Sequence, residues 1–117
     1  MSTTITVRDL VIEAKTAARR ATNRYISEKL ENNDGGLCGF AWVTLYKFDG
    51  KKIRKNSKIG KALEEMGVTK SYDGYFQLWN PSQTIFQNVD CKSEGARAAA
   101  EVFSLAGFQA YAGSRLD

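Results

Sequence analysis

A helical spacing of apolar residues governs the first quarter of the chain. Through residues 6–30, apolar side chains recur at intervals of three and four residues, which places them on one stripe of a helix. These residues are Val7, Leu10, Val11, Ala14, Ala17, Ala18, Ala21 and Tyr25. Thr6 followed by Asp9 has the form of a capping box with Asp in place of Glu, and predicts where the helix begins. Because the stripe is rich in alanine, we expect another element to approach it closely.

Residues 38–48 have the alternation of a β-strand. One face carries Phe40, Trp42, Thr44, Tyr46 and Phe48, and the other carries Ala41, Val43, Leu45 and Lys47. Both faces are largely apolar where the segment begins. Strands of this kind lie in the interior of a sheet, so we predict a central position.

Two further helices are predicted from the residues that begin and end them. Residues 51–61 run from a loop into a short helix, which Ser57 caps and Gly67 ends. A last helix opens at 90–93, carries apolar residues at helical spacing, and ends at Gly107.

Three short strands complete the predicted sheet. Residues 75–79 and 84–89 read as strands joined at 80–83, where the one proline of the chain lies. This pattern predicts an antiparallel hairpin. Residues 108–112 predict a short final strand.

The predicted fold is a two-layer α+β domain. It has a mainly antiparallel sheet of about four strands, with the long N-terminal helix and the C-terminal helix packed on one face. The 117 residues fit a single domain, 1–117, made of an N-terminal helix (1–31) and an α+β core (37–117).

The chain has no sequence signal for a membrane or for secretion. No apolar run approaches the roughly 20 residues that cross a bilayer. The first ten residues lack the basic head and apolar block of a secretory signal. We therefore expect a cytoplasmic protein that does not contact a membrane.

The absence of histidine excludes the commonest catalytic arrangements. Ser-His-Asp and Cys-His sites both need an imidazole as general base. Glu64 and Glu65 are adjacent and point about 100° apart on a helix, so they cannot act as a pair across a substrate. Cys38 and Cys91 do not form a Cys-x-x-Cys pair. We predict no catalytic activity, no cofactor and no metal.

The chain is mildly basic, and one segment is strongly so. It has 17 Lys and Arg against 13 Asp and Glu, a formal charge of +4. Residues 51–61 hold six cations and no acid: Lys51, Lys52, Arg54, Lys55, Lys58 and Lys61. Side chains of this kind neutralise phosphates, so this segment is a candidate contact for nucleic acid or an anionic nucleotide.

The first helix carries a second group of cations. Arg8, Lys15 and Arg19 lie on one side of it and are candidates for the same contact. The alternative is an ordinary solvated face. Ile12 and Ile26 fall on the same side, which favours a contact surface.

Aromatic residues accompany the basic segment in the sequence. Tyr75 and Trp79 are candidates for stacking on bases, together with Tyr46, Tyr72 and Phe86. The alternative is that most of these rings form the core.

The C-terminal residues offer a weaker anion site. Gly113, Ser114 and Arg115 can present backbone donors and a guanidinium to a phosphate, although a tail without fixed structure explains them equally well. Domains that bind double-stranded RNA carry basic charge at the start of their last helix. Here that region, 91–97, is nearly neutral, which argues against readout of a duplex.

Two segments resemble blocks of small, uncharacterised tailed-phage proteins. They are Cys38-Gly39-Phe40-Ala41-Trp42-Val43 and the C-terminal block that ends Ala110-Tyr111-Ala112-Gly113-Ser114-Arg115-Leu116-Asp117. The resemblance covers residues 37–117 and leaves the first helix outside it. It assigns no residue a role. It implies a phage product that acts in the bacterial host cytoplasm, where such proteins often bind a host factor.

Two hypotheses follow, and the sequence does not decide between them. The first is a non-enzymatic module that binds nucleic acid or a nucleotide through residues 51–61 and nearby aromatic rings. The second is a protein-interaction module, such as a phage inhibitor of a host protein or a self-associating homo-oligomer.

Overall fold

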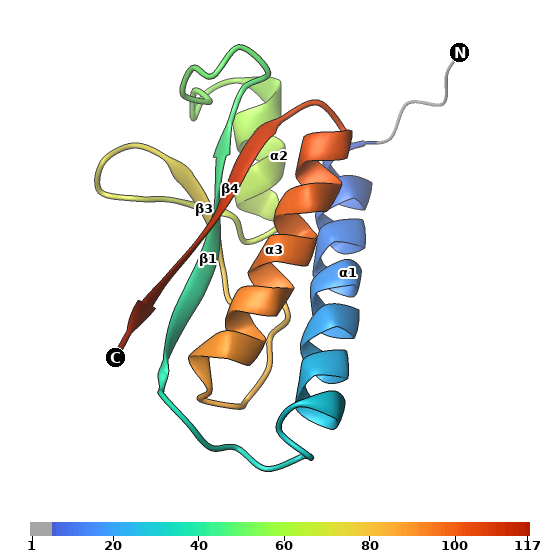
Figure 1. Cartoon of the computed structure of the whole chain (residues 1–117). Helices are drawn as coiled ribbons and strands as arrows, with labels where there is room; N and C mark the ends of the chain where they lie inside the picture. Colours follow the sequence, from blue (N-terminus) through green and yellow to red (C-terminus); the bar gives the residue numbers. More distant parts are fainter. Residues whose placement is uncertain (1–5) are drawn as a thin grey trace.

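Two long helices cover one face of a four-stranded antiparallel sheet (Figure 1). The computed structural model describes residues 6–117; the first five residues, which entered the argument against a secretory signal, lie outside the described part. The elements are α1 (Val7–Glu28), β1 (Gly39–Tyr46), α2 (Lys58–Glu65), β2 (Thr69–Lys70), β3 (Phe76–Trp79), α3 (Val89–Leu105) and β4 (Gln109–Leu116). The predicted α+β architecture is confirmed. Within residues 6–117, no helix is both long enough and apolar enough to span a bilayer.

The strands lie in the order β2-β3-β1-β4, and all neighbours are antiparallel. β1 pairs with β3 on one side and with β4 on the other, so its predicted central position is confirmed. From β1 onward, the element order β-α-β-β-α-β is that of the split β-α-β motif. Helix α1 precedes this motif and packs mainly against α3 (Figure 1).

The buried stripe of α1 differs in one place from the predicted one. The helix begins as expected, because Thr6 Oγ1 accepts a hydrogen bond from Asp9 N at 3.1 Å. Ile26, which was predicted on the basic side, is only 8% exposed, whereas Ile12 is 50% exposed. The stripe turns by about 60° between Val11 and Ile26, because α1 has 3.6 residues per turn and crosses α3 at an angle. Ile26 is therefore a core residue and does not contribute to a contact surface on the basic side of α1, whereas Ile12 stays exposed there.

Helices α1 and α3 approach closely at a glycine. A Cβ added at Gly95 of α3 would lie 2.5 Å from Thr22 Oγ1 and 3.2 Å from Ala18 O. Thr22 is fully buried and donates a hydrogen bond to Cys91 O at 2.7 Å. The close approach expected from the alanine-rich stripe is confirmed. We call this contact the α1–α3 seam.

The predicted hairpin of 75–79 with 84–89 is wrong. β3 pairs with β1 and β2, and residues 84–88 form a loop whose one ladder contact is a bridge between Cys38 and Asn88. Side chains bond to the backbone within this loop: Asn80 Nδ2 donates to Thr84 O at 3.2 Å, and Thr84 Oγ1 accepts from Phe86 N at 3.2 Å. Such local bonds compete with strand pairing.

The true hairpin joins β2 to β3, and the other predicted ends are close to the observed ones. Ser57 caps α2 by accepting from Gly60 N at 3.0 Å, and Gly107 ends α3 with a φ of 106°. Asn88 caps α3, slightly before the predicted start. β4 extends to Leu116, so the segment that includes Gly113 is a paired strand and not an irregular tail.

Candidate functional site on the uncovered face of the sheet

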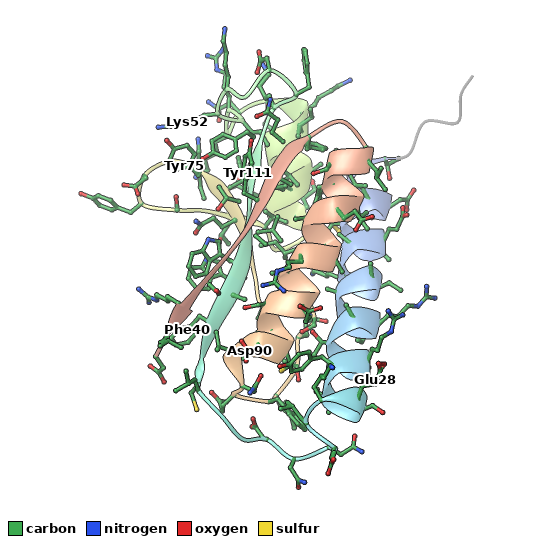
Figure 2. All side chains as sticks on the ribbon, viewed as in Figure 1. Glu28, Phe40, Lys52, Tyr75, Asp90 and Tyr111 are labelled. Atoms are coloured by element: carbon green, nitrogen blue, oxygen red, sulfur yellow. The ribbon has the colours of Figure 1, made fainter. Side chains whose placement is uncertain are left out.

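The sheet has one face that the helices leave uncovered. Successive strand residues point to opposite faces, and in β1 the side chains of Ala41, Val43 and Leu45 are buried in the core. We call the other surface the open face. Figure 2 shows Phe40 and Tyr75 on this side, away from α1. The open face consists of Phe40, Trp42, Thr44 and Tyr46 from β1, Tyr75, Gln77 and Trp79 from the β3 region, and Gln109, Tyr111, Gly113 and Arg115 from β4.

Three rings gather at one end of the open face. Trp42 and Trp79 face each other across β1 and β3, with centroids 4.7 Å apart and planes 29° apart. Phe40 meets Trp79 edge-on at 6.5 Å. A Cβ at Gly113 would lie 2.7 Å from the Trp42 ring, so the glycine allows Trp42 to lie flat over β4. Trp79 remains 43% exposed and therefore presents an accessible ring.

Three tyrosines gather at the other end. Tyr46 of β1 lies 5.2 Å from Tyr75 and 5.7 Å from Tyr111, measured between ring centroids. Tyr111 is 56% exposed. Thr44 and Gln77 join the two aromatic groups through a hydrogen bond of 3.3 Å. Six aromatic rings from three neighbouring strands thus line one continuous surface.

Cations lie at both ends of this surface. Lys52 Nζ lies 4.6 Å from the Tyr75 ring centroid and donates to Asp73 O at 3.0 Å (Figure 2). At the opposite end, the Arg115 guanidinium lies 5.5 Å from the Phe40 ring. Both distances are short enough for a cation–π interaction. This attraction stabilises the positions of the rings and of the cations beside them.

The structure divides the predicted basic segment. Ile53 is buried in the core and anchors the segment at the end of the sheet. Lys52 contacts a ring of the open face, whereas Lys55 pairs with Glu64 of α2 at 3.8 Å. The remaining cations of the segment are exposed in the loop or on α2: Lys51, Arg54, Lys58 and Lys61.

The cations of α1 do not reach the open face, because α1 lies in the helix layer (Figure 1). Arg8 pairs with Glu65 of α2 at 3.3 Å. Lys15 Nζ donates to Met66 O at 3.3 Å, and Arg19 is exposed. Arg8 and Lys15 thus connect α1 to α2. All three cations of α1 lie apart from the predicted site residues on the open face, which are Tyr75, Trp79 and Arg115.

Three residues of the open face were not predicted as site residues: Phe40, Trp42 and Tyr111. The alternation in 38–48 does place Phe40 and Trp42 on one face with Tyr46, which was predicted as a stacking candidate. The sequence does not show that this face stays uncovered, since the opposite face is equally apolar. Tyr111 shares a face with Arg115 because both lie in β4, which is longer than predicted.

Two groups with altered pKa values lie in the helix layer. Burial raises the pKa of the Cys91 thiol, and the nearby Asp34 carboxylate adds to this. Burial also raises the pKa of Tyr25, with further contributions from Asp90 and Glu94. A raised pKa keeps Cys91 as a thiol, which is a poor nucleophile. Within residues 6–117, no three His, Cys, Asp or Glu side chains are grouped so as to hold a metal ion.

Comparison with known proteins adds no family to this geometry. Neither models of protein families, nor curated proteins, nor solved structures gave a match for the chain. The resemblance of residues 37–117 to tailed-phage proteins stays a prediction.

Proposed function

We propose that the open face binds single-stranded nucleic acid and catalyses no reaction. The observation that carries this proposal is the row of six aromatic rings on adjacent strands, with Lys52 and Arg115 at its two ends. Unpaired bases stack on such rings, and cations beside them neutralise the backbone phosphates.

The shape of the surface favours a single strand over a duplex. A duplex hides the ring faces of its bases, whereas a single strand can lay them on a flat sheet. RNA-binding modules with four-stranded sheets stack two or three bases on aromatic side chains in this way. From Phe40 to Tyr46 the row spans about 20 Å at about 3.3 Å per residue, which leaves room for several nucleotides.

An ordinary solvated sheet face does not account for these residues. Antiparallel sheets with one face in water alternate apolar residues inside with polar residues outside. Here the central strand places Phe40, Trp42 and Tyr46 on the uncovered side. Exposed aromatic surface of this kind marks an interaction site.

The test is a titration with fluorescein-labelled single-stranded and duplex oligonucleotides, followed by anisotropy and by tryptophan fluorescence. Both tryptophans lie on the open face, so stacking of bases is expected to quench their emission. We expect binding of the single strand, weaker binding of the duplex, and a log–log salt slope of roughly −1.4, from about −0.7 for each phosphate that Lys52 and Arg115 neutralise. A single strand that does not bind at low salt contradicts the proposal.

Matched charge reversals locate the site within the basic segment. Lys52→Glu is expected to reduce the salt slope by about half, because it removes one of the two contacts. Lys61→Glu makes the same change of charge on α2, away from the rings, and is expected to have a small effect at physiological salt. If the two variants change the salt slope equally, Lys52 does not make a specific contact with a phosphate.

The edge of β4 favours a second candidate function, self-association. Two backbone hydrogen bonds show which way the peptide groups of β1 point: Cys38 O accepts from Asp117 N, on the β4 side, and Ala41 O accepts from Asn80 N, on the β3 side. Because these directions alternate along an antiparallel strand, Ala41 and Val43 point their backbone groups toward β3. Their partners in β4, Ser114 and Ala112, therefore point their backbone groups away from β1. An eight-residue edge strand with outward-pointing groups can pair with the same strand of a second copy.

Ala112→Pro tests this second candidate. Proline removes an outward-pointing N–H and no bond to β1, so the fold is expected to persist. If β4 pairs between copies, the wild type is expected to show a dimer in sedimentation equilibrium, and Ala112→Pro is expected to weaken its association at least tenfold. A wild type that stays monomeric at 100-fold varied concentration contradicts self-association.

A further inference from the structure

A pocket of about 290 Å³ lies at the end of the open face, beside the loop that follows β3. Its lining includes Phe40 and Trp79 from the open face, Asn80 and Ile85 from the loop, and Lys92 from α3. Small-molecule sites usually measure about 300–1,000 Å³, so this pocket suits a chemical group better than a large ligand.

Lys92 is a buried cation without a carboxylate partner. The residue is 6% exposed, and its Nζ donates to Gly39 O at 2.9 Å and lies 5.7 Å from the Phe40 ring centroid. No ion pair involving Lys92 occurs in the described part of the chain. An ammonium has three N–H donors, so one carbonyl satisfies it incompletely. Burying a charge in this way costs stability unless something compensates for it.

The start of α3 already holds two carboxylates, and neither forms an ion pair with Lys92. Asp34 accepts hydrogen bonds from Gln87 N at 2.8 Å and from Asn88 N at 3.1 Å, and Asp90 lies in the first turn. These carboxylates balance the positive partial charge of the helix end. The attraction of an anionic group into the pocket therefore comes from the Lys92 ammonium.

Trp79 supplies a second feature of the pocket. Its ring is 43% exposed and lines the pocket together with Lys92. The pocket thus combines a cation that has no carboxylate partner with an accessible aromatic ring.

We propose that this pocket holds the terminal phosphate of a bound single strand, with the phosphate on Lys92 and the terminal base beside Trp79. A nucleotide with a terminal phosphate carries an anion and a flat ring, which match these two features. This inference rests on the proposed function, since the strand reaches the pocket along the open face.

The experiment compares one oligonucleotide sequence in three forms: unphosphorylated, 5′-phosphorylated and 3′-phosphorylated. Each carries an internal fluorophore, and affinity for the wild-type protein is measured by anisotropy. We expect a phosphate at one end to raise the affinity about tenfold or more, because charge-assisted hydrogen bonds are among the strongest. A phosphate at the other end is expected to have little effect.

Lys92→Met removes the ammonium and keeps an unbranched side chain. It is expected to abolish the gain from the phosphate, measured within the variant as the ratio of its affinities for the phosphorylated and the unphosphorylated strand. Arg97→Met is the matched control, because Arg97 is an exposed cation on the same helix and pairs with Glu94. It is expected to preserve the gain. Circular dichroism and thermal melts check that both variants fold. If Lys92→Met does not fold, the comparison of the three oligonucleotide forms on the wild-type protein still tests the proposal.

The outcomes separate the two proposals. An unphosphorylated strand that binds without any gain from either phosphate overturns the terminal-phosphate site alone. An equal gain from both ends, or a gain that survives in Lys92→Met, also overturns it, since general charge then explains the effect. If no form of the strand binds, both proposals fail.

Discussion

Trp79→Ala is expected to lower the affinity of the protein for a single-stranded oligonucleotide by roughly 5- to 150-fold. Loss of one aromatic stacking partner costs about 1–3 kcal/mol per base, and each 1.4 kcal/mol is tenfold in affinity. Trp79 is well placed to make this contact, because it is 43% exposed and its ring is held by contacts with Trp42 and Phe40. Anisotropy titration at fixed salt measures the change.

Two further variants make the result specific to stacking. Trp79→Phe keeps a flat ring and is expected to retain most of the affinity. Leu105→Ala removes an exposed apolar side chain from the end of α3, in the helix layer, and is expected to have no effect. If Trp79→Ala binds as tightly as the wild type, stacking on the open face is ruled out as the main source of affinity.

Gly95→Val is expected to destabilise the fold by about 2–4 kcal/mol. The new side chain overlaps Thr22 Oγ1 and Ala18 O in the α1–α3 seam, and overpacking of this kind costs about 1–3 kcal/mol. Displacing Thr22 also breaks its hydrogen bond to Cys91 O, for about 1 kcal/mol more. Because a domain of this size is stable by only about 5–15 kcal/mol, the midpoint of urea unfolding is expected to fall markedly. Gly35→Ala is the control, since nothing lies within 4 Å of the added Cβ.

A double-mutant cycle attributes this cost to the seam. Thr22→Ala removes the oxygen that an added Cβ at position 95 meets. The cost of Gly95→Ala together with Thr22→Ala is therefore expected to be smaller than the sum of the two single costs. Additive costs would mean that the two residues do not share this contact.

The sequence predicts the fold well where a segment carries its own signals. The stripe in α1, the alternation in β1 and the caps Thr6 and Ser57 are all local, and all are found in the structure. The error at 84–89 arises because strand pairing is not local: the turn at 80–83 resembles a hairpin, yet β3 pairs with β1 from much earlier in the chain. β2 has two residues, which is too short for any periodic pattern.

The candidate site is less predictable than the fold for a physical reason. Alternation shows which side chains of β1 share a face, but not which face the helices cover, because Val43 and Trp42 are both compatible with a core. The charge of residues 51–61 was evident, whereas the orientation of Lys52 toward Tyr75 depends on tertiary contacts. Lys92 gave no signal, because its burial results from a loop and a strand distant in sequence.

Pairing of β1 with β4 also sets the order in which the protein can become active. The two strands are far apart along the chain, so their pairing closes a long loop. The conformational entropy of this loop is lost before the contacts between the strands form. The glycine that seats Trp42 and the arginine beside Phe40 both arrive with β4. A chain in which β1 has paired only with β3 would therefore have an incomplete row of rings. Ligand binding should consequently appear in refolding kinetics only once β4 has paired with β1, and it reports completion of the native sheet.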